Sequence, residues 1–207
     1  MTVPVRKIAI VLVTVLCGCS IFPPRPAPNF FVLSSEPDTA EANMNASRVP
    51  PALLTSIQLG LGPIRFPDYL DRLEVVTRID ETRVSISETD RWAAPLDSAF
   101  ARVLAQDLSA RVPDSHVALY PWYHDRAPDF QIVVDVQRFD VSIRGLANLQ
   151  ASWTIRDLKA NALLCSTTSD VRESGGDLKS AGPAAALSRT IADFSSQIAF
   201  RVNKLRR

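Results

Sequence analysis

The side chains with the most chemical potential in this 207-residue chain are its three cysteines and two histidines. Cys17 and Cys19 are separated by one residue, a spacing that fits a metal site, a redox pair or a processing signal. A metal site needs about four ligands, and no other ligand lies near this pair in the sequence. Cys165 lies in the stretch ALLCSTTS, where a small, half-buried strand residue is the favoured interpretation.

The residues before the pair indicate a processing signal. Arg6 and Lys7 are the only charged residues among the first 24, and a short apolar run from Ile8 to Leu16 follows them. A basic start, a short apolar segment and small residues together describe a secretory signal peptide. A membrane-spanning helix is the alternative, but Ile8 to Phe22 would extend only about 22 Å against a hydrocarbon core about 30 Å thick.

The end of this segment, Leu16-Cys17-Gly18-Cys19, resembles the lipobox of bacterial lipoproteins. The resemblance implies that residues 1–18 are a lipoprotein signal peptide and that Cys19 becomes a lipidated N-terminus, with palmitate among its acyl groups. Cys17 lacks a small residue before it, so only Cys19 fits. Two or more acyl chains anchor a protein stably in a membrane. Ser20 implies the periplasmic face of the outer membrane, and the periplasmic face of the inner membrane is the alternative location.

The charge balance of the mature chain excludes one class of partner. From Cys19 onward the chain has 21 basic and 22 acidic residues, so it has no strong basic field with which to bind nucleic acid. After lipidation one thiol remains, and no internal disulfide can form. The length suits one domain that buries a core without disulfide or metal support.

The two histidines do not form a catalytic or metal-binding pattern. Neither His116 nor His124 has the spacing of zinc ligands, and adjacent residues such as His124 and Asp125 rarely make a base–acid pair. The chain has no G-x-S-x-G or H-E-x-x-H motif, and the glycines near position 60 lack the lysine of a phosphate loop. The sequence therefore predicts a protein that is not an enzyme and takes no metal or cofactor. A lipid-modifying hydrolase that uses a histidine base is the enzymatic alternative.

Patterns of apolar residues predict the elements that follow the signal. Residues 19–28 contain four prolines and predict an extended, lipidated tether, and residues 29–207 predict a single α+β domain. Alternation with period two predicts strands, and a period of 3.6 predicts helices. Strands are expected at 29–34, 53–62, 72–79, 82–87, 115–122, 130–142, 147–157 and 162–171, and helices at 95–113 and 183–207.

This order predicts a mixed or antiparallel sheet of seven to eight strands with two helices on one face, arranged as a pseudo-repeat of β-β-β-α. A change of phase predicts a β-bulge near Arg138. The first helix is expected to turn Asp107 away from the core. The apolar side of the hairpin at 72–87 is expected to comprise Leu73, Val75, Val84 and Ile86.

Two groups of aromatic residues are candidates for a binding surface. Tyr120, Trp122 and Tyr123 cluster at the end of a predicted strand, and Phe66 and Tyr69 lie in a proline-flanked loop. Aromatic residues are enriched at interfaces, although covering the edge of a core is their commoner role. For the loop, a packed connection is an equal alternative.

Two motifs and the lipobox resemble a known family. The motifs are Pro67-Asp68-Tyr69-Leu70-Asp71-Arg72 and Arg91-Trp92-Ala93-Ala94-Pro95-Leu96. They are similar to the auxiliary lipoproteins of MCE-type (mammalian-cell-entry) ABC transport systems, with the paraquat-inducible protein C family as the nearest type. Leu73 and Ala94 depart from the pattern, which commonly has a proline and an acidic residue there. With Trp92 from the second motif, the candidate partner-binding residues are Phe66, Tyr69, Trp92, Tyr120, Trp122 and Tyr123.

The resemblance implies a lipoprotein subunit, anchored in the outer membrane, that docks a periplasmic MCE-domain protein. That partner would form a lipid conduit to an inner-membrane ABC transporter. The implied role is lipid trafficking between membranes and membrane integrity, with assembly as a ring or docking collar. The alternative is a structural or assembly lipoprotein of the cell envelope that has no transporter partner.

Overall fold

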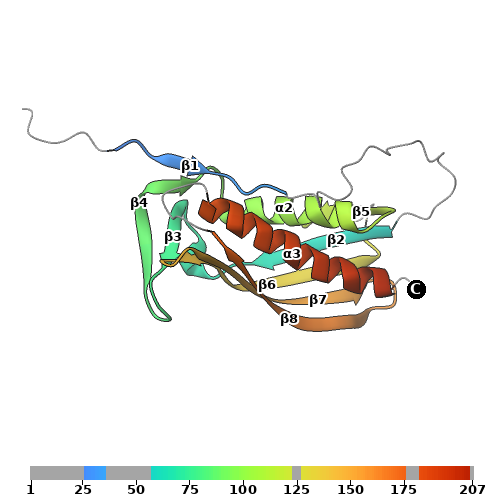
Figure 1. Ribbon diagram of the computed structural model, residues 1–207. Helices are drawn as coiled ribbons and strands as arrows, with labels where there is room; N and C mark the ends of the chain where they lie inside the picture. Colours follow the sequence, from blue (N-terminus) through green and yellow to red (C-terminus); the bar gives the residue numbers. More distant parts are fainter. Residues whose placement is uncertain (1–25, 36–56, 123–126, 176–181, 206–207) are drawn as a thin grey trace, which may run out of the picture.

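The computed structural model describes residues 26–35, 57–122, 127–175 and 182–205 (Figure 1). The predicted signal peptide, Cys19 and most of the predicted tether lie outside these ranges. Residues 26–28, the last three of the tether, are exposed. Within the described ranges, no helix combines the length and the apolar character that crossing a bilayer requires.

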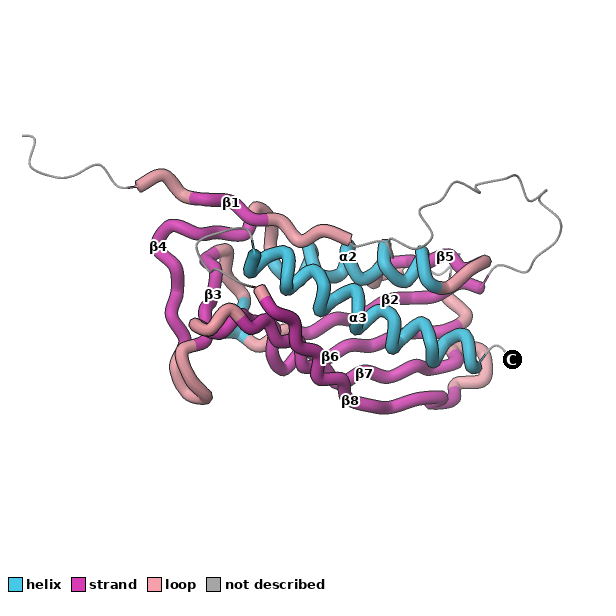
Figure 2. Tube along the Cα trace, in the orientation of Figure 1, coloured by secondary structure: helices cyan, strands magenta, loops and turns pink. Residues whose placement is uncertain are grey.

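One mixed sheet of eight strands carries both long helices on the same face (Figures 1 and 2). The α+β prediction is therefore confirmed, and the chain order repeats β-β-β-α as predicted, in β2-β3-β4-α2 and β6-β7-β8-α3. The elements are β1 (Asn29–Phe31), β2 (Ile57–Arg65), the short 3-10 helix η1 (Asp68–Leu70), β3 (Glu74–Arg78), β4 (Val84–Trp92), α2 (Leu96–Arg111), β5 (Ser115–Leu119), β6 (Phe130–Ser142), β7 (Leu146–Asp157), β8 (Ala162–Ser174) and α3 (Gly182–Leu205).

Strand β6 organises the sheet. One edge of β6 pairs antiparallel with β7, which pairs antiparallel with β8. The other edge pairs in parallel with β2 near the start of β6 and with β3 near its end. Strand β5 lies beyond β2, while β4 and then β1 lie beyond β3. The two β-β-β-α units therefore repeat in chain order but differ in strand pairing.

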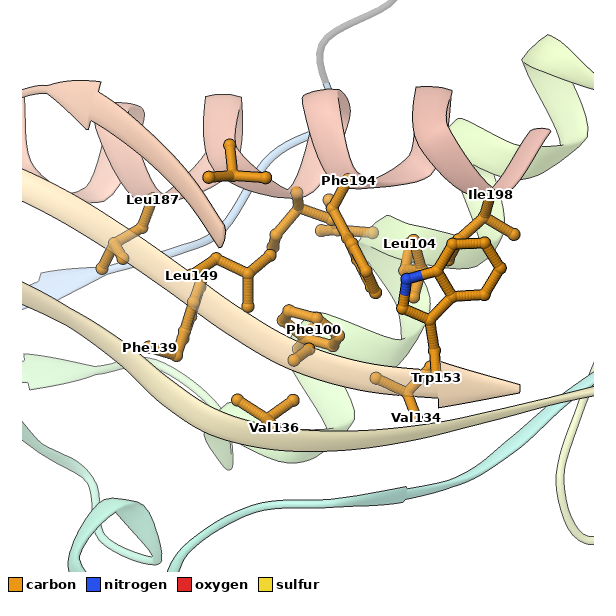
Figure 3. Packing of buried hydrophobic residues seen from close by; sticks show 14 of the residues in the cluster. Phe100, Leu104, Val134, Val136, Phe139, Leu149, Trp153, Leu187, Phe194 and Ile198 are labelled. Carbon is orange, nitrogen blue, oxygen red and sulfur yellow. The ribbon is translucent and has the colours of Figure 1, made fainter. Parts of the chain in front are cut away.

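The hydrophobic core lies between the sheet and the two helices (Figure 3). Alternate residues of β7 from Leu149 to Ile155 point into it, as predicted, and their side chains are almost fully buried. From α3, Phe194 packs edge-on against Trp153, with ring centroids 6.3 Å apart. The β6–β7 register shifts between Val136 and Arg138, which confirms the predicted bulge.

The prediction for Asp107 on α2 was wrong, because its side chain is fully buried. Residues that follow β1 in the chain reach this part of the helix, and the Ser35 hydroxyl donates a 2.5 Å hydrogen bond to the Asp107 carboxylate. The Arg111 guanidinium lies 3.7 Å from the same carboxylate, one helical turn onward. Burial of this carboxylate is therefore offset by an ion pair and a hydrogen bond.

The predicted apolar side of the β3–β4 hairpin was wrong in part. Leu73 is 43% exposed and Ile86 is 46% exposed, whereas Val76, from the other phase, is buried. The cause is the register of the hairpin: Val76 pairs with Ile86 and Arg78 with Val84, so Val75 lies on the opposite face from Val84 and Ile86. Beyond these pairs the ladder is irregular, because Glu74 pairs with Arg91. Two steps along β3 thus correspond to five along β4, so β4 bulges outward between these pairs.

Candidate functional site

The aromatic cluster at the end of β5 combines an exposed ring with a supporting ring. Tyr120 is 55% exposed, and its ring meets the half-buried Trp122 edge-on at 5.2 Å between centroids. Tyr123, the third predicted member, lies outside the described residues. An exposed aromatic ring held by a second ring loses little conformational freedom when a partner binds.

This cluster lies over the glycine side of β2. A Cβ atom at Gly60 would lie 2.6 Å from Cγ of Pro128 and 2.9 Å from the Trp122 ring, so only glycine leaves room for that ring. At Gly62, φ is +122°, a conformation that favours glycine. The side of β2 opposite the helices is therefore covered by aromatic and proline side chains at these positions.

Phe66 seals the end of the core. Its ring meets Phe100 of α2 at 5.2 Å and Phe139 of β6 at 6.2 Å, both in edge-to-face geometry. Phe66 is half-buried, and its surroundings are those of a packed connection. This arrangement connects the loop after β2 to both layers of the fold.

Tyr69 belongs to a charged cluster around Asp140, whose side chain is fully buried. Nε of Arg78 lies 2.7 Å from one carboxylate oxygen of Asp140, and Nε of Arg138 lies 2.9 Å from the other. The Tyr69 hydroxyl accepts a 3.1 Å hydrogen bond from Arg78 and donates a 3.5 Å one to Asp140. Burial raises the pKa of the Tyr69 hydroxyl above its ordinary value, and the Asp140 carboxylate raises it further.

The sequence patterns did not predict the Asp140 cluster. The signal for it was an aspartate between Phe139 and Val141, two core residues that follow the bulge. A charged residue inside an apolar strand needs partners, but its two arginines come from positions that no short-range pattern connects. Arg138 and Asp140 lie on β6, and Arg78 arrives from β3.

Trp92 is only 5% exposed and ends β4. Its backbone N–H donates a 2.6 Å hydrogen bond to the carbonyl of Leu73. This bond brings together the two motifs of the family resemblance, which are about twenty residues apart in the sequence. A cavity of about 320 Å³ with a mixed polar and apolar lining lies between them, lined by Ile64, Phe66, Asp68, Leu70, Asp71, Arg72, Leu73, Pro95, Leu96 and Asp97.

A second cavity, of about 280 Å³, is mostly apolar and lies where β1, β3 and β4 meet the start of α3. Sequence analysis did not find it, because its walls come from five separate elements. Its lining consists of Phe31, Val75, Thr77, Ser85, Ser87, Asp90, Trp92, Val141, Ile143, Pro183, Ala184 and Leu187.

The two histidines that the sequence offers as candidate catalytic bases differ in how the structure describes them. His116 lies on the exposed edge strand β5, and His124 lies outside the described residues. Among residues 26–35, 57–122, 127–175 and 182–205, no three histidine, cysteine, aspartate or glutamate side chains are grouped to hold a metal ion. Cys165 is a free, half-buried cysteine on β8, as the sequence predicts.

Comparison with known families identifies the chain. Residues 38–199 match the model of the family described as the ABC-type transport auxiliary lipoprotein component. The chain belongs to this family. The predicted resemblance is confirmed, and the description is that of a transport component. No curated protein matches the sequence significantly.

Two solved structures share the fold of this auxiliary lipoprotein. The crystal structure of an uncharacterized protein is 19% identical, with a TM-score of 0.68, and covers 86% of this chain and 99% of its own. Protein XCC0632 from Xanthomonas campestris is 13% identical, with a TM-score of 0.63, and covers 85% of this chain and 98% of its own. At these identities the likeness establishes the fold alone.

Proposed function

We propose that this chain is an outer-membrane lipoprotein subunit of an MCE-type ABC transport system. In this role it docks a periplasmic MCE-domain protein and supports lipid trafficking between the membranes and the integrity of the envelope. The observation that carries the proposal is the family match over residues 38–199. A ring or docking collar of several copies is part of the same proposal.

Lipidation at Cys19 would anchor the domain. Nine residues lie between Cys19 and Asn29, where β1 begins. At about 3.1 Å per residue, a proline-rich tether of this length extends roughly 28 Å. Such a tether holds the domain close to the membrane and leaves it free to meet a partner in the periplasm.

Tyr120 and Trp122 are the best placed of the six candidate residues for contact with a partner. Tyr120 is exposed and Trp122 supports it, while Phe66, Tyr69 and Trp92 are more deeply packed and position the neighbouring loops. Tyr123 follows directly in the sequence and belongs to the same proposed surface. Aromatic rings with one exposed side are favoured at the centres of interfaces.

Affinity capture tests the docking surface. The tagged, lipidated protein, extracted from membranes in detergent, should recover an MCE-domain protein. Tyr120→Ala should weaken recovery about tenfold, a loss typical of a central aromatic contact. Phe200→Ala is the matched control, because this ring on α3 is 67% exposed and lies outside the proposed surface. Equal losses in both variants would contradict the assignment of the surface.

Fractionation tests the anchor and separates the alternatives. Native protein should sediment with outer membranes, carry acyl groups at Cys19 and cross-link to further copies of itself. An intact leader with an unmodified thiol contradicts the lipoprotein assignment, and sedimentation with inner membranes favours the alternative location. A lipidated protein that recovers no MCE-domain partner supports a structural or assembly role in the envelope.

A further inference from the structure

The apolar cavity is built around the irregular part of β4. Within this strand, the Ser87 hydroxyl oxygen accepts hydrogen bonds from the backbone N–H of Asp90 at 2.9 Å and of Thr89 at 3.3 Å. The three extra residues of β4 are therefore held by bonds within the strand itself. Bulges of this kind re-aim side chains and are frequent beside functional sites.

Strand β1 forms another wall of the cavity. The backbone N–H of Ala93 donates a 2.8 Å hydrogen bond to the carbonyl of Phe31, and Phe31 pairs with Trp92 across the two strands. Both aromatic side chains line the cavity. The wall is thus fixed by sheet hydrogen bonds and presents two large apolar surfaces to the space.

The polar residues that line the cavity lie on β3 and β4. The charged one, Asp90, already has hydrogen-bond partners. The Asp90 carboxylate accepts a 2.9 Å hydrogen bond from the Asn29 amide and a 3.1 Å one from the Ser87 hydroxyl. The hydroxyls of Thr77, Ser85 and Ser87 provide further hydrogen-bonding groups. Opposite them, the lining residues from β6 and α3 are apolar.

We propose that this cavity binds one hydrocarbon chain of a membrane lipid. An apolar cavity of about 150 Å³ accepts a benzene ring. The cavity here, at about 280 Å³, has room for an apolar group nearly twice that size. A segment of an acyl chain fills such a space against Phe31, Trp92 and Leu187, and the hydroxyl-bearing side suits the polar end of the lipid.

The position of the cavity in the chain supports this occupant. Phe31 lines the cavity and follows Cys19 by twelve residues. The proposed tether of roughly 28 Å keeps the cavity near a bilayer, which is a concentrated source of hydrocarbon chains. The inference rests on the proposed membrane anchor and gives the lipid-trafficking role a binding site on this subunit.

Trp92 provides a direct reporter, because bromine atoms quench an indole ring on contact. The lipidated full-length protein, held in digitonin to avoid alkyl detergent, is titrated with dibromostearate. Saturable quenching is expected in the native protein and in Trp153→Phe, whose ring is buried beneath α3. In Trp92→Phe the quenching should disappear. Quenching that survives in Trp92→Phe overturns the proposal. The proposal is also overturned if neither the native lipidated protein nor an unlipidated form shows quenching.

A second pair of variants tests the cavity without removing the reporter. Ala184→Leu places a larger side chain in the space, and Ile86→Leu changes an exposed β4 residue that does not line it. Excluding about two methylenes of ligand should weaken dibromostearate binding about tenfold in Ala184→Leu. Ile86→Leu should bind as the native protein does. Equal affinity in all three proteins contradicts the site.

Unlipidated Cys19→Ala protein separates two sources of hydrocarbon. Quenching in both the lipidated and unlipidated proteins supports an exchangeable membrane lipid. Quenching confined to Cys19→Ala protein overturns that occupant, because the chain's own acyl group would then already fill the cavity. These results are independent of affinity capture, so a failed capture with retained quenching rejects the docking proposal alone.

Discussion

In the half of the molecule built on β7, β8 and α3, the packed half, the apolar side chains of α3 and β7 are buried against one another, and a cavity of about 410 Å³ lies at the surface between β8 and α3. The end built on β1, β3 and β4 instead has a mostly apolar cavity beside core residues such as Trp92 and Leu187. In the packed half, Nε1 of Trp153 donates to the Ser169 hydroxyl at 3.0 Å, and that hydroxyl donates to the Gln197 side chain at 2.7 Å. At the other end, Ser85, Ser87 and Asp90 of the irregular strand β4 line the wall of a cavity.

This difference in packing shows how one sheet can use one region for the stability of the fold and another for a binding cavity. Under α3, apolar side chains alternate regularly along β7 and are almost fully buried, so each is committed to the core. Toward β4, two strands of unequal length are joined by local hydrogen bonds, and the side chains there are not all needed for packing. Binding sites on rigid scaffolds commonly lie in such regions.

Removal of a phenylalanine ring from each region should show the difference in packing most clearly. Phe194→Ala, in the packed half, should cost about 3–5 kcal/mol of unfolding free energy, because it leaves a hole between Phe100 and Trp153. Phe31→Ala, beside the existing cavity, should cost about 1–2 kcal/mol, since that ring is only half-buried. Chemical denaturation of the purified protein measures both. Equal costs would show that the two regions are packed alike.

Asp140 tests the boundary between the regions, since β6 leaves the packed half and meets β3 there. Asp140→Asn should destabilise the fold by about 3 kcal/mol, because it leaves the guanidinium groups of Arg78 and Arg138 without a counter-charge. Tyr69→Phe removes only the hydroxyl contacts and should cost about 1 kcal/mol. A smaller loss for Asp140→Asn than for Tyr69→Phe, in the same denaturation experiment, contradicts this account.

Two alanines on α3 allow the packing of the two regions to be compared at single side chains. Ala186 is fully buried, and its Cβ lies 3.3 Å from the position of a Cβ built at Gly175. Ala186→Leu should therefore cost about 1–3 kcal/mol through overpacking. Ala184 lines the cavity, so Ala184→Leu should change the midpoint of thermal unfolding little. A large loss in Ala184→Leu would show that the cavity cannot accept further carbon atoms.

The packed half was predictable from the sequence because its signals are local. Alternation from Leu149 to Ile155 placed β7, and the phase change near Arg138 placed the bulge. Apolar spacing also placed α3, from Leu187 to Val202. Each of these patterns is read within one element, and one face of each element is buried against a single neighbouring layer.

The cavity and the charged positions were not predictable, because their environment is assembled from distant segments. Helical periodicity put Asp107 outside the core, but Ser35 lies 72 positions away in the sequence and covers it. The hairpin pattern gave the wrong phase because the pairing register of β3 and β4, which puts Val75 and Val84 on opposite faces, leaves no compositional mark. Tyr69 read as an interface residue, although its partners Arg78 and Asp140 come from β3 and β6.

The smallest expected effect lies at the other end of β6, where Asp129 precedes the strand. Its carboxylate accepts a 2.9 Å hydrogen bond from the backbone N–H of Gln58 and pairs with Lys159 at 2.5 Å. The Gln58 bond, followed by Lys159, lowers the pKa of Asp129 below its ordinary value of 3.8. Because the folded pKa is the lower one, this stabilisation is present above pH 3.8 and is lost as the pH falls through the folded pKa.

Asp129→Asn should therefore cost about 1 kcal/mol at neutral pH, and the loss of stability on acidification should become shallower. Lys159→Met should reproduce only part of both effects, because the stronger Gln58 hydrogen bond remains and the lysine is exposed. Denaturation midpoints measured from neutral to acidic pH give the change of stability with pH for both variants. If the native protein and Asp129→Asn lose stability in parallel on acidification, Asp129 does not carry this part of the pH dependence. Of Asp129 and Asp140, only the buried Asp140 would then contribute to the fold through its charge.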